Sequence, residues 1–457
     1  MNYTIDNAPL SWRHIRVVSI AALGQLIGAG LATLVSVIIP LYQLTSHPEL
    51  SSVMQGLVGA MDLIGIMVGS VILGKLSDKY GYLLFFRLCP LLICVSAVVA
   101  MLFPSIPVLL VCLFLMGFGI GGEYSLDSDY ISSLTPDKWR SILVGSAKAA
   151  SAVGNILVAG VCFLIVKDWT DAALWPKLLW IIIAISGLMI LLRIRFWQNP
   201  VWLADHGEAA QAETDVHRFL GPNVNLTPER KSGTAPKQKR ISWGTFLKQN
   251  WRNVIFTGVP WACEGLGVYG IGVFLPILVM ALGIEPVGAE GSNIMHVANS
   301  VEITVWINCI TLPGFIIGLI MMNRVKGAKI QIIGFLISAV ALGLLLISYS
   351  NHWAKWISIG TFMLFELFLN IGPHLMTYVL PSKVYPEEIR GQGSGLAASI
   401  GKAGAVIGVF IIPILLKAHG TTSVLIVSIA VMFAGALITW IFDPFRTTKP
   451  STVNIKH

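Results

Sequence analysis

The sequence has few charged residues. Asp, Glu, Lys and Arg together make up 12% of the 457 residues, whereas soluble domains carry about 25%. Hydrophobic residues make up 55%. This composition excludes an ordinary soluble domain and predicts a chain that crosses a lipid bilayer several times.

Paired cysteines are also missing. The six cysteines are scattered singly, with no C-x-x-C spacing, so neither a disulfide framework nor a zinc site is expected. Cys94, Cys112 and Cys162 lie in apolar runs, where a cysteine serves as a small buried hydrophobe. The chain is polar through Asn7 and its first apolar run is too long for a signal h-region, so no cleavable signal peptide is predicted.

Enzyme motifs are absent. The sequence has no P-loop, no H-E-x-x-H and no nucleophile elbow, so we expect no enzyme activity, no cofactor and no metal. Without a nucleotide site, ion gradients are the available source of energy.

Long apolar runs fill most of the chain. A spanning helix needs about 20 mostly apolar residues, and twelve candidates meet this requirement. They lie near 16–42, 54–75, 83–103, 107–131, 141–166, 176–197, 253–282, 301–322, 329–349, 355–380, 391–416 and 422–442.

A polar stretch separates the sixth and seventh runs. It contains LTPERKSGTAPKQKR and is typical of a solvated linker, with or without short surface helices. All but six of the 31 Lys and Arg residues fall on the side of this linker and of both termini, which predicts that this side is cytoplasmic. The net charge of +8 is then a topology signal, and we expect no nucleic-acid partner.

The chain contains an internal repeat. Pro136 to Arg140 and Pro386 to Arg390 share the form P-x-x-x-R, 250 residues apart, each before a long apolar run. The prediction is an all-α membrane protein of twelve helices in two six-helix halves. The expected boundaries are residues 1–198 for the first half, 199–250 for the cytoplasmic linker and 251–457 for the second half.

These features resemble the major facilitator superfamily over nearly the whole chain. GKLSDKYG at 74–81 is similar to that superfamily's G-x-L-[S/A]-D-[R/K]-x-G loop. The resemblance implies conformational latches at the cytoplasmic gate, with Asp78, Arg87, Arg140 and Arg390 as candidates.

Within the superfamily, the phosphate:proton symporters and their organic-ion relatives are most similar. GIGGEYSL at 119–126, N-x-G-P at 370–373 and S-x-G-K-x-G-A at 399–405 match motifs of that group, and Trp261 and Tyr269 keep the spacing of its W-x-x-x-D-x-x-x-Y. The family aspartate falls at Gly265, with Glu264 one position earlier; the family glutamine falls at Ser151; and the first-helix acids are missing. Because of these departures, the resemblance does not decide whether phosphate is the substrate.

Ionisable residues inside the spans mark a pathway, because hydrocarbon tolerates them badly. Glu123 and Asp127 lie i,i+4 on one helix face and are, with Glu264, the candidates for proton coupling. The rival interpretation places Asp127 at the cytoplasmic end, paired with Arg140 or Lys138. Lys402, about 12 Å into its helix at 1.5 Å per residue, is expected to contact substrate or a carboxylate, and for Lys148 snorkelling is an equal alternative.

Further substrate contacts are expected around an interrupted seventh span. Gly and Pro surround Glu264 there, which is typical of a helix that breaks at a binding site, although close helix packing is the rival explanation. His374 follows Gly372-Pro373, a predicted kink. The full set of candidates for substrate binding is Tyr124, Lys148, Ser151, Trp261, Glu264, Tyr269, Glu366, His374 and Lys402.

The leading hypothesis is a proton-coupled symporter that moves a small polar or ionic metabolite by alternating access. The spans hold seven acids against two lysines, a balance that suits proton coupling or a substrate with a positive group. The runner-up is a proton-antiport exporter of cationic or amphipathic compounds, and a third possibility is a receptor that binds without translocating. The expected partners are a small-molecule substrate, protons and the lipid bilayer. We expect a monomer in a bacterial inner membrane.

Overall fold

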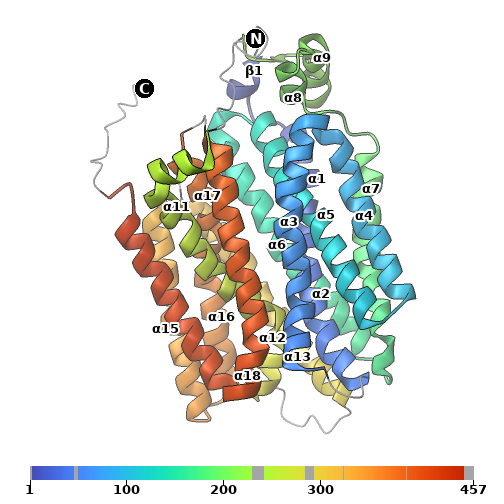
Figure 1. Ribbon diagram of the computed structural model, residues 1–457, viewed down its shortest axis with the longest axis vertical. Coiled ribbons are helices and arrows are strands. Elements are labelled where there is room, and N and C mark those ends of the chain that lie inside the picture. Colours follow the sequence, from blue (N-terminus) through green and yellow to red (C-terminus); the bar gives the residue numbers. More distant parts are fainter. Residues whose placement is uncertain are drawn as a thin grey trace.

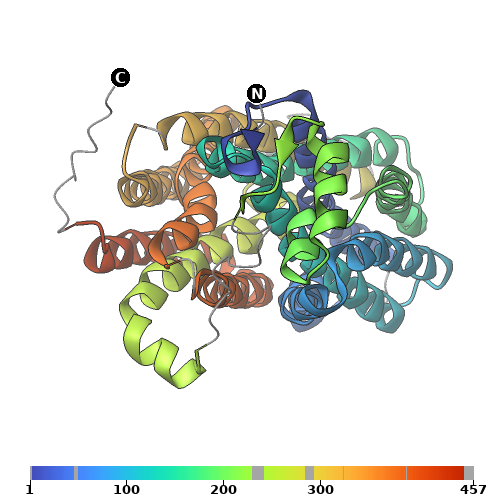
Figure 2. The ribbon, with the colours of Figure 1, turned by 90° about the horizontal axis from the view of Figure 1, so that it is seen from above.

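The computed structural model describes residues 3–45, 50–228, 241–283, 293–322, 324–386 and 389–446, apart from the side chains of Asp78, Ser128, Asp129, Ser141 and Arg390. Long helices run side by side along the long axis of the molecule (Figure 1). Seen from above, they form two groups, blue to green and yellow to red (Figure 2). These groups are the two halves of the chain.

The first half consists of six membrane-crossing segments. α1 runs directly into α2, and the 3-10 helix η2 into α7, so that each pair makes one span. Gly81, with φ of +96°, forms the turn between α3 and α4, a conformation that glycine adopts without strain. The elements are α1 (Trp12–Ala21), α2 (Leu23–Thr45), α3 (Ser52–Tyr80), α4 (Tyr82–Leu102), α5 (Ile106–Leu134), α6 (Asp137–Val166), η2 (Ala172–Leu179) and α7 (Trp180–Arg193).

The second half repeats this arrangement with more interruptions. Its elements are α11 (Trp243–Gly265), the π-helical turn η3 (Leu266–Ile271), α12 (Leu275–Ala281), α13 (Asn293–Cys309), α14 (Thr311–Met321), α15 (Gly327–Ser350), α16 (Lys355–Ile371), α17 (Pro373–Val384) and α18 (Arg390–Phe442).

The twelve predicted spans are confirmed. Eleven helical segments of the described residues are long and apolar enough to cross a membrane. The last one, Gly391–Phe442, contains two spans, because Gly420 breaks its helix with φ of +73°. The seventh prediction was wrong at its start, since α11 begins ten residues earlier, at Trp243, where Ser242 caps it by accepting a hydrogen bond from the Thr245 amide.

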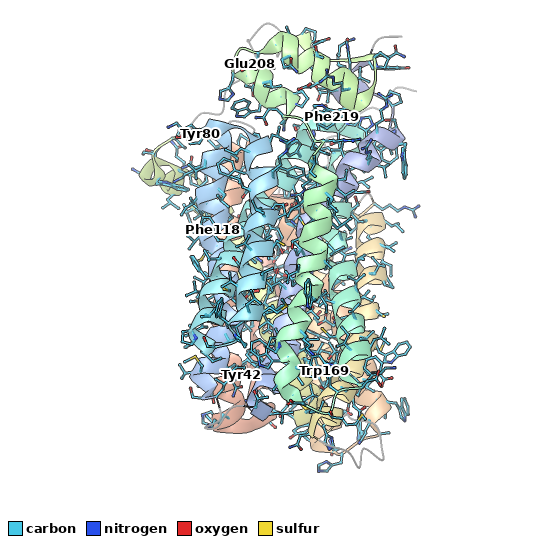
Figure 3. All side chains as sticks on the ribbon, turned by 90° about the vertical axis from the view of Figure 1, so that its right-hand side faces the viewer. Tyr42, Tyr80, Phe118, Trp169, Glu208 and Phe219 are labelled. Carbon is cyan, nitrogen blue, oxygen red and sulfur yellow. The ribbon has the colours of Figure 1, made fainter. Side chains whose placement is uncertain are left out.

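The first part of the predicted linker is packed against the first half. It forms α8 (Pro200–Asp205), α9 (Ala209–Leu220) and β2 (Val224–Asn225), and β2 pairs in parallel with β1 (Tyr3–Thr4), which the 3-10 helix η1 (Ile5–Asn7) follows. Phe219 of α9 meets the rings of Phe196 and Trp197 edge-on. Figure 3 shows Glu208 and Phe219 at one end of the molecule and Tyr42 and Trp169 at the other. Residues 229–240, which hold most of the basic linker, lie outside the described residues.

The halves are in close contact at the end opposite α8 and α9. There α3 packs against α18, and a Cβ added to Gly56 would lie 2.8 Å from the Phe410 carbonyl oxygen. A Cβ added to Gly59 would lie 2.8 Å from a methyl group of Val409. Glycine therefore permits the backbones of the two halves to approach here.

Candidate transport site

Lys402 of α18 lies between the halves. Its Nζ donates a hydrogen bond of 2.8 Å to the Tyr269 hydroxyl, and it lies 4.1 Å from the centre of the Tyr269 ring. It also lies 5.3 Å from the ring centre of Tyr124, on α5 of the other half. Tyr124 and Tyr269 share a side-chain hydrogen bond. The ammonium group thus faces inward, as the substrate-contact interpretation requires, and does not snorkel to the membrane surface.

Lys148 of α6 approaches the same place from the first half. Its Nζ lies 5.8 Å from the ring centre of Tyr124 and 6.0 Å from that of Tyr378, within the range of cation–π attraction. The side chain is buried, with 8% exposure. Snorkelling is therefore excluded for Lys148, and the two lysines flank one tyrosine.

Aromatic rings line the second half of this region. Trp261 meets Tyr378 edge-on, with 6.3 Å between ring centres. Gly401 packs on Trp261, where a Cβ would lie 2.6 Å from the indole Cγ. Tyr269 stands on the π-helical turn η3, a distortion that is frequent at functional sites. The predicted break of the seventh span is confirmed.

Glu264 and His374 form an acid–imidazole pair. Nδ1 of His374 lies 3.3 Å from Oε1 of Glu264, and both side chains are buried. His374 gains this position because Gly372, with φ of −106° and ψ of −95°, ends α16 and α17 restarts at Pro373. The predicted kink is confirmed, and it turns His374 toward the seventh span.

Two other candidate side chains, those of Glu366 and Ser151, form hydrogen bonds within their own helices. Glu366 accepts from the side chain of Asn370 at 3.2 Å, one turn later on α16. Ser151 donates to the Lys148 carbonyl oxygen at 2.7 Å. Both side chains are buried, and neither makes a contact within hydrogen-bond distance of the two ammonium groups.

Asp62 of α3 was not among the predicted site residues. It is 1% exposed; Oδ1 accepts from the Leu63 amide at 2.8 Å, and Oδ2 is buried without a hydrogen-bond partner. It interacts electrostatically with Lys402 and Tyr269. The sequence signal that could have found it is an acid in the middle of an apolar span.

A second buried cluster lies within the first half. Nη1 of Arg193, the last residue of α7, donates to both carboxylate oxygens of Glu123 at 2.7 and 2.6 Å. Nη2 lies 3.8 Å from Oδ1 of Asp127, and neither oxygen of Asp127 has a hydrogen-bond partner. Arg193 also donates to the Phe86 carbonyl oxygen at 3.0 Å. We call Glu123, Asp127 and Arg193 the carboxylate–arginine cluster.

Two predictions are corrected by this cluster. Arg193 was counted among the basic residues around the linker, but its side chain is 0% exposed. Asp127 was given a rival pairing with Arg140, but Arg140 instead contacts Asp6 at 3.2 Å and Asp137 at 2.7 Å. The side chain of an arginine at the end of an apolar run can point back toward the interior of the membrane. The position of Arg193 in the sequence therefore did not reveal its partner.

Small residues of α2 cover the cluster and its neighbour. A Cβ on Gly24 would lie 2.8 Å from Cβ of Glu123 and would collide with the carboxylate of Asp127. A Cβ on Gly28 would collide with the Tyr124 hydroxyl. The backbone of α2 therefore seals these side chains from solvent, and only glycine leaves them room.

The predicted gate residues contact their own half where the structure describes them. Arg87 donates to the carbonyl oxygens of Arg193, Ile194 and Phe196 at 3.3, 2.7 and 2.9 Å, which fixes the end of α7. The side chains of Asp78 and Arg390 lie outside the described residues.

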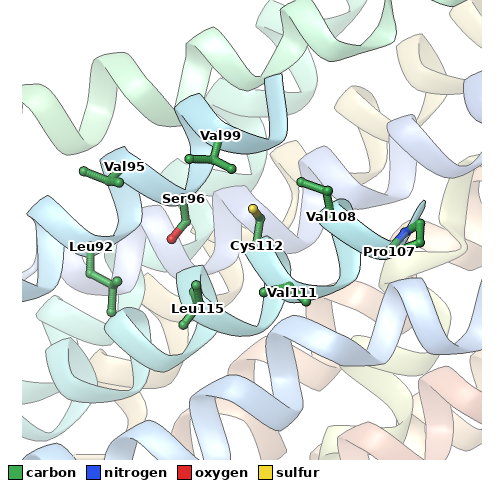
Figure 4. Close-up of a pocket in the computed structure, with 9 residues that line it drawn as sticks. All are labelled: Leu92, Val95, Ser96, Val99, Pro107, Val108, Val111, Cys112 and Leu115. Atoms are coloured by element: carbon green, nitrogen blue, oxygen red, sulfur yellow. The ribbon is translucent and has the colours of Figure 1, made fainter. Parts of the chain in front are cut away.

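One apolar pocket lies away from the transport site. It has a volume of about 440 Å³ and lies between α4 and α5, lined by Leu92, Val95, Ser96, Val99, Pro107, Val108, Val111, Cys112 and Leu115 (Figure 4). Val95 and Val111 are more than half exposed, so the pocket opens on the apolar flank of the helix pair. Within the described residues, no group of three His, Cys, Asp or Glu side chains is arranged to hold a metal ion.

The family follows from the match of nearly the whole chain to one family model. The model described as "Sugar (and other) transporter" matches residues 27–452. The chain belongs to this family. It is a major facilitator transporter that crosses the membrane many times, and it is not an enzyme.

Individual relatives of the transporter have low sequence identity to it. The "Inner membrane metabolite transport protein YgcS" of Escherichia coli (strain K12) is 26% identical, covering 98% of this chain and 95% of the relative. The "Repressible high-affinity phosphate permease" of Neurospora crassa is 23% identical, covering 88% and 78%. Among solved structures, the xylose transporter XylE from E. coli in a partially occluded inward open conformation matches with a TM-score of 0.78, at 18% identity, over 95% of this chain and 98% of XylE.

Proposed function

We propose that the transporter is a proton-coupled symporter, which moves a small polar or ionic metabolite across the cytoplasmic membrane by alternating access of one central site. It works as a monomer with both termini and the linker in the cytoplasm. Relatives named for metabolite and phosphate transport, and a structural neighbour named as a proton:xylose symporter, support this proposal.

The observation that carries proton coupling is the charge balance of the carboxylate–arginine cluster. Two carboxylates share one guanidinium, and all three side chains are at most 1% exposed. If every group were ionised, one negative charge would stay buried without compensation, which costs several kcal/mol. Like-charged carboxylates that share a site relieve this cost when one of them takes up a proton. The cluster is therefore a place where a proton is bound.

The proton belongs on Asp127 in this conformation. Glu123 takes both short hydrogen bonds from Arg193, whereas Asp127 has none. Tyr124 follows Glu123 directly and contacts both lysines of the central site. Tyr124 thereby links the cluster to the central site, so that protonation or deprotonation of the cluster can influence the binding of substrate. Glu264, paired with His374, is the second coupling candidate.

The remaining candidates keep their proposed roles. Tyr124, Lys148, Ser151, Trp261, Glu264, Tyr269, Glu366, His374 and Lys402 line the substrate path. Asp78, Arg87, Arg140 and Arg390 act at the cytoplasmic gate, where Arg87 holds the end of the helix that carries Arg193.

The test is substrate-driven proton movement in proteoliposomes that contain the dye pyranine. Inorganic phosphate, D-gluconate, succinate and D-glucose are added outside, one at a time. Symport predicts that a transported probe acidifies the lumen, and that Asp127→Asn loses this signal while entry of the labelled probe down its own gradient persists. Entry without any proton movement would contradict the proposal, and alkalinisation of the lumen would favour a proton antiporter.

A further inference from the structure

We infer that the proposed cytoplasmic end of the second half carries a binding site for an anionic phospholipid. Three segments form this site: the start of α11 (241–252), the turn into α15 with its first residues (324–329), and the end of α18 with the residues after it (440–446). We call them together the basic–aromatic surface. The inference does not use the central site, and it requires neither a particular substrate nor proton coupling.

The start of α11 lies at the level of the lipid headgroups. The apolar run of this span begins near residue 253, but the helix itself begins at Trp243. The residues between them include Lys248 and Arg252, whose charges are costly in hydrocarbon. Seen from above, this yellow-green part of α11 projects outward from the group of helices (Figure 2). It is therefore placed to lie against the membrane surface.

One face of this helical extension is apolar and exposed. Trp243, Leu247 and Trp251 follow one another at intervals of four residues and so share a helix face. Their side chains are 54%, 44% and 52% exposed. Phe246, in contrast, is buried and packs on Tyr385, with 5.8 Å between ring centres. A helix with exposed Trp and Leu on one face and with Lys and Arg beside them is typical of the membrane interface.

Contacts between side chains and backbone join the three segments. The ring of Trp251 meets that of Phe442, at the end of α18, edge-on with 6.1 Å between centres. Nζ of Lys326, just before α15, donates to the Phe445 carbonyl oxygen at 3.4 Å. The basic–aromatic surface is therefore continuous from α11 across the end of α18 to the start of α15.

The basic–aromatic surface has an excess of positive charge. Its three segments contain six cations and one acid, Asp443, whose Oδ1 accepts from the Phe445 amide at 2.9 Å. All six cations are exposed, and none of them forms an ion pair with a carboxylate among the described residues. A cluster of about four to eight Lys and Arg beside the cytoplasmic end of a spanning helix attracts anionic lipids. The six are Lys248, Arg252, Arg324, Lys326, Lys329 and Arg446.

Both parts of an anionic phospholipid find partners on this surface. The guanidinium of Arg252 lies 5.9 Å from the ring centre of Trp251, and that of Arg446 lies 4.3 Å from the ring centre of Trp440. A guanidinium binds a phosphate group through two parallel hydrogen bonds, and Trp side chains favour the headgroup level of the membrane. A zwitterionic phospholipid offers the same chains, but its own cation compensates its phosphate. The surface therefore favours a lipid with net negative charge.

The experiment is native mass spectrometry of the detergent-purified transporter, titrated with dioleoyl-phosphatidylglycerol and, in parallel, with dioleoyl-phosphatidylcholine. Phosphatidylglycerol should bind more tightly. The triple variant Lys248→Gln, Arg252→Gln and Arg446→Gln should weaken its binding about tenfold or more and leave the binding of phosphatidylcholine unchanged. The double variant Trp243→Gln and Leu247→Gln should also weaken the binding of phosphatidylglycerol, although all charges remain.

The matched control removes the same amount of charge from the opposite end of the molecule. Lys167→Gln, Lys177→Gln and Lys417→Gln, all at exposed lysines, are combined and should keep the affinity of the parent protein for phosphatidylglycerol. An equal loss of affinity in the two triple variants would overturn the inference, because net charge alone would then explain it. The same holds if the parent protein shows no preference for phosphatidylglycerol.

Inorganic phosphate distinguishes a lipid site from a site for a soluble anion. At equal concentration it should not displace phosphatidylglycerol, because it lacks the acyl chains; displacement would overturn the inference. Thermal unfolding checks each variant, and Arg252→Gln and Arg446→Gln as single changes replace the first triple variant if that protein lacks a cooperative transition. Because neither substrate nor a proton gradient is present, failure of this test leaves the symport test unaffected.

Discussion

Arg193 and Glu123 form a two-point ion pair in the interior of the first half, with Nη1 of the arginine 2.7 and 2.6 Å from the two carboxylate oxygens. The arginine ends α7 and the glutamate stands in the middle of α5. Asp127, one turn further along α5, is the third member and the one without a hydrogen bond. The proposed proton-binding site is therefore built on the residue next to Tyr124, which lies beside Lys148 and Lys402.

Glu123→Gln should abolish proton-driven accumulation while sparing counterflow. The glutamine removes one negative charge, so that Asp127 ionises and becomes the partner of Arg193, and the cluster no longer exchanges its proton. Counterflow of labelled for unlabelled substrate needs no net proton. Uptake against a gradient and counterflow are compared in proteoliposomes, with Glu208→Gln, at an exposed residue, as the control. Loss of substrate binding in Glu123→Gln would instead make Glu123 a substrate ligand.

Arg193→Met should lower the free energy of unfolding by about 3–5 kcal/mol, because it leaves a buried carboxylate without its partner. The double variant Arg193→Met with Glu123→Gln should recover part of this loss, since the uncompensated charge is gone. Thermal unfolding in detergent measures both. Arg195→Met, two residues later and exposed, should be neutral; equal effects at both arginines would refute the cluster's role in stability.

Lys402→Ala should weaken substrate binding strongly. Lys402→Arg should not restore it fully, because a planar guanidinium differs from an ammonium in shape and donor geometry. Tyr269→Phe removes the hydroxyl that accepts from Lys402 and should have a smaller effect of the same sign. Uptake rate and affinity are measured for each, beside Lys417→Ala at an exposed lysine. Unchanged affinity and rate in folded Lys402→Ala would remove Lys402 from the site.

Gly24→Ala should destabilise the transporter by about 1–3 kcal/mol, the usual cost of overpacking. The new methyl group would collide with the Asp127 carboxylate and lie 2.8 Å from Cβ of Glu123. Gly160→Ala, in a transmembrane helix with open space at its Cβ position, is the control and should be neutral or stabilising. The melting temperatures of the two variants are compared with that of the parent protein. An equal change in melting temperature for Gly24→Ala and Gly160→Ala would show that α2 does not pack on the cluster as described.

A cysteine at Glu208 should react with an impermeant maleimide only from the cytoplasm, and one at Asp168 only from outside. The two positions lie at opposite ends of the molecule, near the labelled Glu208 and Trp169 of Figure 3. The measurement is the extent of labelling of each variant in intact and in permeabilised cells, compared with that of the parent protein. Labelling of the Glu208 cysteine in intact cells would reverse the proposed topology.

The number and order of the spans were predictable from the sequence alone. Lipid cannot satisfy a backbone N–H or C=O group, so each long apolar run must become a helix, and this requirement is local. The same holds for the breaks at Gly372-Pro373 and within the seventh span, because proline and glycine act on their own helix.

Only the tertiary structure decided which charges meet. The spans hold seven acids and two lysines, a count that placed Arg193 with the linker, although this residue neutralises Glu123 inside the bundle. It also left Asp62 out of the candidate site and offered Arg140 or Lys138 as an alternative partner of Asp127. The sequence indicated that most of these acids are buried, since they lie in apolar runs, and Asp62, Glu123, Asp127, Glu264 and Glu366 are buried in the structure. Their partners depended on helix rotation and on the packing of both α5 and α7 against α4, which lets Arg193 reach Glu123 and which no short pattern in the chain contains.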